Sequence, residues 1–70
     1  MTDKLMTLVN QIKETRLDHN ITQEQLAEVV GVSRQTIIAI EKGNYTPSLL
    51  LAMQLAKYFK VSVDYLFTIK

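Results

Sequence analysis

Apolar residues recur along this chain every three or four positions, which is the spacing of one buried face of an α-helix. Over 22–31 that face is formed by Leu26, Val29 and Val30. Thr22 and Gln25 stand three positions apart, as in a capping box, where each side chain satisfies a free amide at the helix start. Gly31 suits the left-handed conformation that ends a helix. These signals predict a helix over 23–30.

A second helix is predicted directly afterwards, over 34–42. Ser33 is a favourable N-cap, and Gly43 is suited to end the helix. Because an α-helix turns by about 100° per residue, Ile37 and Ile40 share one face while Ile38 falls on the other. The outer face therefore shows an isoleucine together with Arg34, Gln35 and Lys42.

The remaining segments predict three further helices and short terminal strands. The segment 10–20 has a helical pattern with Asn10 as its N-cap, and Pro47 suits the start of a helix over 48–60. Ser62 caps a last short turn. Residues 4–9 either extend the first helix or form a strand, and 66–70 is a candidate strand. We therefore expect a mainly α fold of five helices joined by roughly two to five residues.

Two short helices joined by a turn that contains glycine describe a helix-turn-helix. Here the turn is "GVS", with Ala27 small where the helices approach each other and Val32 pointing inward. Helical hairpins occur in many unrelated domains, so the spacing alone leaves the family open.

Composition bounds the class of protein without deciding its function. The chain has 70 residues, of which 47% are hydrophobic, more than so small a core comfortably buries, and this excess hints at self-association. The longest apolar run is Leu49–Met53, far below the ~20 residues of a membrane span. The N-terminus lacks the pattern of a signal peptide. We expect a cytoplasmic protein with no membrane partner.

The charge distribution and the scarcity of reactive side chains argue against most kinds of catalytic and metal site. The net charge is +1, and the basic excess lies in residues 31–70, which is a weak indication of a polyanionic partner. There is no cysteine, and His19 is the only histidine, so we expect neither a metal site nor a cofactor. No nucleophile–base pair or carboxylate dyad is visible, so an enzyme is not expected.

The stretch "TQEQLAEVVGVSRQTIIAIEKGNYTPSLLLAMQLAKYFKVSVDYLF" resembles the lambda-repressor and Cro-like helix-turn-helix regulators. It is most similar to short stand-alone dimeric members of the cytolysin-repressor type, which share "SRQTI", "IEKG-Y-PSL" and "LA-x-x-F". The resemblance covers about Asn10 to Phe67. It implies one five-helix DNA-binding domain over 1–70, a motif over about 22–42, and strands at 4–9 and 66–70 that help to form a two-fold dimer.

The resemblance also implies roles for individual residues. The helix 34–42 enters the major groove of double-stranded DNA, where base readout falls to Arg34, Gln35, Ile38 and Ala39. Ile38 stands where the family more often has a polar residue, and we expect it to meet a thymine methyl group. Contacts to the DNA backbone are implied for Thr22, Gln23, Ser33, Thr36, Lys42, Asn44 and Tyr45.

Several of these roles have simpler alternatives. For Arg34 the alternative is a contact to a phosphate instead of a base, and for Thr36 it is a structural role. For Lys42 the alternative is a charge that only complements the dipole at the helix end, and for Tyr45 it is a ring that packs on its own loop instead of contacting DNA.

Two further sets of residues are structural by the same resemblance. Arg16 and Glu41 are expected to form a partly buried ion pair. The dimer interface is implied for Val63, Leu66, Phe67 and Ile69, with the alternative that these residues only close the core of one chain.

The function implied is a homodimeric repressor that binds an inverted-repeat operator, in a bacterial or phage setting and on the nucleoid when bound. Two alternatives stay open. The first is an antitoxin that represses its own toxin–antitoxin pair, and the second is a protein-interaction module on the same fold.

Overall fold

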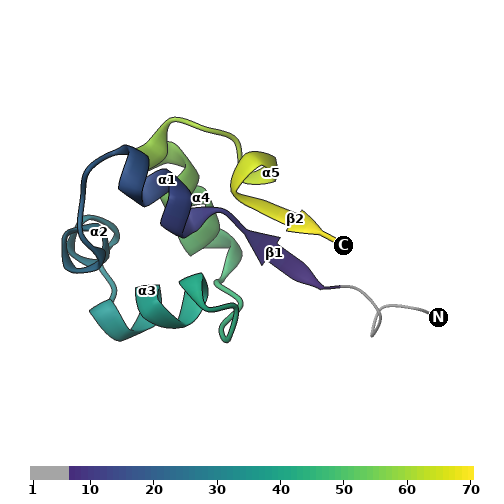
Figure 1. The fold of residues 1–70 in the computed structure, drawn as a ribbon, viewed down its shortest axis with the longest axis horizontal. Coiled ribbons are helices and arrows are strands. Elements are labelled where there is room, and N and C mark those ends of the chain that lie inside the picture. The colour runs from purple at the N-terminus through teal and green to yellow at the C-terminus, as the bar shows by residue number, and fades with distance from the viewer. Residues whose placement is uncertain (1–6) are drawn as a thin grey trace.

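The computed structural model describes residues 7–70, which form a mainly α fold of five helices and a two-stranded ribbon (Figure 1). The elements follow in the order β1 (Leu8–Asn10), α1 (Ile12–Asp18), α2 (Gln23–Val30), α3 (Arg34–Glu41), α4 (Leu49–Phe59), α5 (Val63–Leu66) and β2 (Phe67–Ile69). The fold class expected from the sequence is confirmed.

Hydrogen bonds from side chains to the backbone set where the helices begin. The capping box of α2 is complete: the Gln25 amide donates to Thr22 Oγ1 at 3.0 Å, and the Thr22 amide donates to Gln25 Oε1 at 2.8 Å. The hydroxyls of Ser33, Ser48 and Ser62 accept amide hydrogen bonds at the starts of α3, α4 and α5.

Two helix starts differ from the expectation by one residue. The N-cap of α1 is Gln11, and Asn10 acts from one position earlier, with its Oδ1 accepting from the Ile12 amide at 3.1 Å. Asn10 is extended because it belongs to β1. Pro47 precedes the N-cap Ser48 and so lies outside α4.

The core lies between the helices and is closed by α5. The large side chains with no exposed surface are Ile12, Leu26, Ile37, Ile40, Leu55 and Leu66. The prediction that Leu66 belongs to a dimer interface is therefore wrong, because its side chain is enclosed within its own chain. Val63 and Phe67 are half-buried against this core, and Ile69 is exposed.

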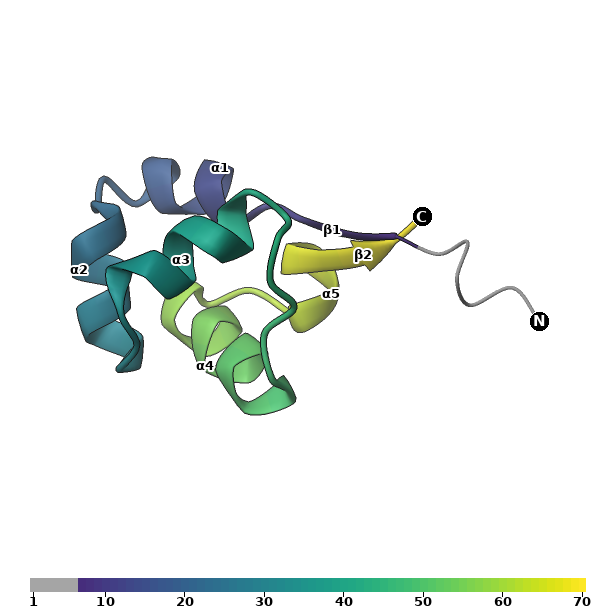
Figure 2. The same cartoon turned by 90° about the horizontal axis from the view of Figure 1, so that it is seen from below.

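The terminal strands pair with each other within one chain. Leu8 lies opposite Ile69, Val9 opposite Thr68 and Asn10 opposite Phe67, in antiparallel register. The predicted strand at 4–9 starts at Leu8, and its first part, 4–6, lies outside the described residues. Figures 1 and 2 place the ribbon at the opposite end of the molecule from α2. Asn10 Nδ2 donates to the Ile40 carbonyl at 2.9 Å, which ties the ribbon to the end of α3.

Within residues 7–70, no helix combines the length and the apolar composition needed to cross a membrane.

Candidate nucleic-acid interface

The turn between α2 and α3 is fixed by its backbone. Gly31 has φ +76°, and the Val32 amide donates back to the Ala27 carbonyl at 3.0 Å, so the chain leaves α2 in one defined direction. A Cβ at Gly31 would meet no atom within 4 Å, so glycine is favoured here by conformation alone. Ser33 then caps α3, and its Oγ lies 3.1 Å from Thr36 Oγ1. The turn thus sets the orientation of α3 against α2.

One face of α3 is buried in the core and the other is turned outward. Ile37 and Ile40 are fully buried and hold the helix against the core. On the opposite side Arg34 and Gln35 are exposed, and Ile38 is half-buried. Ile38 is not among the apolar side chains of the core or those packed on it.

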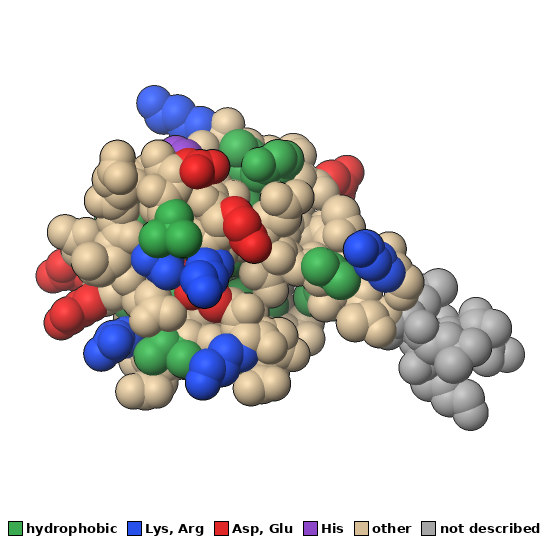
Figure 3. Space-filling view, in the orientation of Figure 1, with side chains coloured by type: hydrophobic (Ala, Val, Ile, Leu, Met, Phe, Trp, Pro, Cys, Tyr) green, Lys and Arg blue, Asp and Glu red, His purple; other side chains and the backbone are tan. Residues whose placement is uncertain are grey.

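Arg34, Ile38 and Lys42 follow each other at four-residue intervals, so they lie on successive turns of one side. Ala39 is half-buried beside them. In Figure 3 basic and apolar side chains gather along the edge where Figure 1 places α3, whereas acidic side chains gather at the edge near α2. The outward side of α3 thus presents cations, an amide and an apolar group together.

The end of α3 is closed by the backbone. Gly43 has φ +80°, its amide donates to the Ile40 carbonyl at 2.9 Å, and the Asn44 amide donates to the Ala39 carbonyl at 2.9 Å. The side chains of Lys42, Asn44 and Tyr45 are exposed. The Tyr45 ring also lines a cleft of about 240 Å³ with Leu8, Pro47 and Phe67.

A buried polar network lies beneath this surface. Arg16 Nε donates to Glu41 Oε2 at 2.7 Å and Nη2 donates to Oε1 at 3.3 Å, while the two side chains are only 9% and 4% exposed. Arg16 Nη1 also donates to the Ile21 carbonyl at 3.0 Å. The ion pair expected between Arg16 and Glu41 is thus formed, and it joins α1 to the last turn of α3.

Gln23 is the third member of the network, and the sequence did not indicate this. Its Nε2 donates to Glu41 Oε1 at 3.0 Å, so its side chain is held from within the chain. An amide NH₂ carries two hydrogens, and the second stays available to another acceptor. The sequence signal that could have indicated this contact is Glu41 at the end of α3, because its carboxylate accepts hydrogen bonds from α2 as well as from α1.

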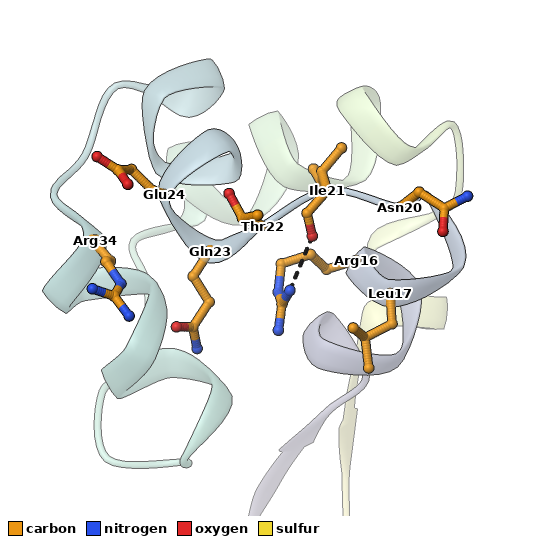
Figure 4. Close-up of a pocket in the computed structure, with 8 residues that line it drawn as sticks. All are labelled: Arg16, Leu17, Asn20, Ile21, Thr22, Gln23, Glu24 and Arg34. Atoms are coloured by element: carbon orange, nitrogen blue, oxygen red, sulfur yellow. Dashed lines mark hydrogen bonds between the residues drawn. The ribbon is translucent and has the colours of Figure 1, made fainter.

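An open groove of about 670 Å³ borders the start of α2 (Figure 4). Arg16, Gln23 and Arg34 line it from α1, α2 and α3. In Figure 4 the Arg34 and Gln23 side chains point toward the same opening, and Glu24 also lines the groove, with its carboxylate turned to the side opposite Gln23. The first turn of a helix has amides without intrahelical partners and the positive end of the helix dipole, which favours an anion. The groove therefore suits a phosphate group.

His19 has a structural position. Its Nδ1 lies 2.9 Å from the Thr15 carbonyl, and its ring packs edge-on against Phe59 at 4.9 Å between ring centroids. Within the described part of the chain, no three His, Asp or Glu side chains lie close enough together to hold a metal ion.

Comparison with known proteins gives a consistent result. The family model for helix-turn-helix proteins matches residues 12–66. An HTH-type transcriptional regulator of Methanocaldococcus jannaschii is 59% identical over 58 residues, which cover 83% of this chain and 88% of the relative. The cryptic phage CTXphi transcriptional repressor RstR of Vibrio cholerae is 33% identical over 77% of this chain and 49% of its own length. The solved structure of the restriction-modification controller protein C.AhdI from Aeromonas hydrophila superposes with a TM-score of 0.71, at 26% identity, over 77% of this chain and 78% of that one.

Proposed function

This chain belongs to the helix-turn-helix family of DNA-binding transcriptional regulators, which are not enzymes, and we propose that it is a homodimeric repressor whose α3 reads an inverted-repeat operator. The observation that carries the proposal is the outward side of α3, where Arg34, Gln35 and Ile38 point away from the core. Two buried isoleucines on the other side hold this helix in place. Repression is proposed by analogy with RstR, although another relative, BcrR of Enterococcus faecalis, is a transcriptional activator.

Base readout is assigned by chemistry and position. Arg34 is matched to guanine O6 and N7, and Gln35 to adenine N6 and N7. Ile38 and Ala39 carry only apolar groups, which suit the methyl group of thymine. An Ile38 side chain that is not needed for the core is free to face a base pair.

Backbone contacts are assigned to the two ends of the surface. Thr22, Gln23 and the start of α2 meet one phosphate, with Gln23 held by Glu41 through one amide hydrogen and donating the other. Ser33 and Thr36, whose hydroxyls lie together, meet a second phosphate near the start of α3. The exposed side chains beyond α3 meet the DNA backbone at the other end, namely Lys42, Asn44 and Tyr45.

A second copy is needed for selectivity. An α3 of eight residues is about 12 Å long and spans only a few base pairs. Two such helices about 34–36 Å apart read adjacent major grooves of a symmetric site. We therefore assign the homodimer as the DNA-binding unit.

Selection of bound sites from random double-stranded DNA tests the proposal, followed by gel-shift titration of the selected site. Arg34→Ala and Gln35→Ala are expected to weaken binding by about 10- to 100-fold each, because each bidentate contact discriminates by about 1–3 kcal/mol. Lys57→Ala removes a cation from the exposed side of α4 and is the matched control. If both α3 variants bind as the unmodified protein does, α3 does not read the bases.

The dependence of binding on salt gives an independent measurement. With about six to ten phosphates neutralised by the dimer, affinity falls by roughly 10³–10⁵ between 50 and 200 mM salt. An affinity that does not change over this range would contradict phosphate contact through Lys42 and the groove at α2.

A further inference from the structure

Arg34 borders two grooves that differ in charge. The groove at the start of α2 has two cations along its wall, Arg16 and Arg34, and one carboxylate, that of Glu24. A second groove of about 450 Å³ lies between α2 and the start of α3, and there the balance is reversed. Its charged lining consists of Glu24, Glu28 and Arg34, and it is called the acidic groove below. Arg34 thus stands where a mainly basic surface meets a mainly acidic one.

The fold sets this neighbourhood of charges. Glu24 and Glu28 are four residues apart, so they lie one above the other on the same side of α2, and both are exposed. The turn between α2 and α3 is fixed by its backbone hydrogen bonds, and Arg34 is the first residue after it. In Figure 4, Glu24 and Arg34 lie on the same side of Gln23. The guanidinium is therefore kept in the field of both carboxylates.

The carboxylates attract Arg34 without closing a contact with it. Arg16 and Glu41 form a buried ion pair at 2.7 Å, whereas Arg34 forms no ion pair within 4 Å in the described range 7–70. Exposed charges still act on each other over this range, because the screening length at 0.1 M salt is about 10 Å. The Arg34 side chain is thus biased in direction but stays able to meet DNA.

The two carboxylates treat the possible DNA acceptors differently. A phosphate has a negative charge, so a phosphate bound to Arg34 is repelled by Glu24 and Glu28 beside it. Guanine O6 and N7 are uncharged acceptors, and a guanine edge at the same place meets no such repulsion. The acidic groove therefore penalises one of the two roles that the sequence left open for Arg34, and it spares the other.

We propose that Glu24 and Glu28 are positioning residues, which direct the Arg34 guanidinium to a guanine edge and away from phosphates. They thereby set part of the discrimination between the operator and unrelated DNA, which is bound through phosphates. This inference rests on the proposed function, in which Arg34 reads a base. It adds two residues of α2 that determine specificity without touching a base.

Gel-shift titration of Glu24→Gln, Glu28→Gln and the double variant tests the proposal, on the selected site and on unrelated DNA of the same length. An exposed charge interaction changes an affinity by about 1.5- to 5-fold. In the double variant, affinity for unrelated DNA is expected to rise by about fivefold and affinity for the selected site by less than about twofold. The ratio of the two affinities then falls by about threefold. Binding to unrelated DNA is expected to gain about one unit of salt slope, because Arg34 then neutralises a phosphate.

Two variants serve as controls for the loss of charge. Asp64→Asn removes an exposed carboxylate from α5, which Figure 1 places far from α2, and it is expected to change the ratio by less than about 1.5-fold. Glu28→Asp keeps the charge and is expected to keep the ratio of the unmodified protein. Glu24 and Glu28 are exposed, so the melting temperature of the double variant is expected to stay within about 4 °C. A fall of more than about 10 °C would overturn the proposal by giving the carboxylates a structural role.

The same substitutions in an Arg34→Ala background show whether the carboxylates act through Arg34. Without the guanidinium there is no side chain to direct, so Glu24→Gln with Glu28→Gln is expected to leave the ratio unchanged. If the ratio still falls by about threefold in this background, the carboxylates repel DNA directly and the proposal is wrong.

The remaining outcomes separate this inference from the proposed function. If Arg34→Ala weakens binding to the selected site but the glutamine variants keep the ratio, only this inference fails. If Arg34→Ala binds the selected site as the unmodified protein does, base readout by Arg34 fails and this inference fails with it. A ratio that falls in the double variant only while Arg34 is present would support both.

Discussion

Replacement of Glu41 with alanine is the most informative single change to this protein. The substitution removes the two carboxylate oxygens that accept from the Arg16 guanidinium, of which Oε1 also accepts from the Gln23 amide. Arg16 is then left buried with only the Ile21 carbonyl as a partner. Glu41 lies at the end of α3, next to residues assigned to DNA, so a loss of DNA binding in this variant invites a wrong interpretation.

The expected magnitude follows from the burial of the pair. Removal of one partner from a buried ion pair costs about 3–5 kcal/mol, because the other charge stays in the core without compensation. A chain of 70 residues has a total stability of roughly 4–10 kcal/mol. The change therefore removes a large fraction of the stability, and we expect the melting temperature to fall by roughly 12–40 °C.

Thermal unfolding followed by circular dichroism measures this effect, at one fixed protein concentration because dimerisation adds to stability. Glu24→Ala is the matched control, since it removes an exposed carboxylate from the first turn of α2. A melting temperature of Glu41→Ala within about 4 °C of the unmodified protein would refute the structural interpretation of the pair. The double variant Arg16→Met with Glu41→Leu is expected to recover most of the loss, because apolar residues replace a buried pair at little cost.

Three further substitutions have defined outcomes in the same unfolding assay. Lys60 ends α4 with φ +60°, so Lys60→Gly is expected to relieve about 1 kcal/mol of strain and raise the melting temperature by about 4–8 °C; a decrease would contradict this. The hydroxyl of Thr15 is buried without a hydrogen-bond partner among residues 7–70, so Thr15→Val is expected to stabilise the chain by about 1 kcal/mol, and a loss of stability would show that the hydroxyl is satisfied. Ile38→Asn is expected to change the DNA sequences selected while shifting the melting temperature by less than about 4 °C; a fall of more than about 10 °C would place Ile38 in the core.

The sequence predicted the α2–α3 motif well because its determinants are local. The capping box of Thr22 and Gln25, the N-cap Ser33 and the left-handed glycines act within a few residues of each other. The burial of Ile37 and Ile40 follows from helical periodicity in the same way. Local hydrogen bonds of this kind leave a readable pattern in a single sequence.

Contacts between distant segments were not predictable in the same way. Leu66 and Ile69 are both apolar, but one is enclosed and the other exposed, because α5 and the ribbon turn different sides toward the core. Asn10 was predicted as an N-cap, but it is extended because it pairs with Phe67 in the ribbon. A single sequence does not show this pairing, because the two residues are far apart along the chain. In α4, by contrast, the helical spacing of Leu51, Leu55 and Phe59 indicates the side that is buried in the structure.

The pairing of β1 with β2 has a consequence for the order of folding. Leu8 and Ile69 are separated by 61 positions, so closing the ribbon costs on the order of 4 kcal/mol of chain entropy, whereas α2 and α3 meet across a turn of three residues. We therefore expect the helical hairpin to form early and the ribbon to close last. The bond from Asn10 to the Ile40 carbonyl forms with the ribbon, so α3 gains its last anchor at the end of folding. In native-state hydrogen exchange, we expect the amides of Thr7 and Lys70 to open by local fraying and the amide of Leu26 to exchange only when the whole chain unfolds.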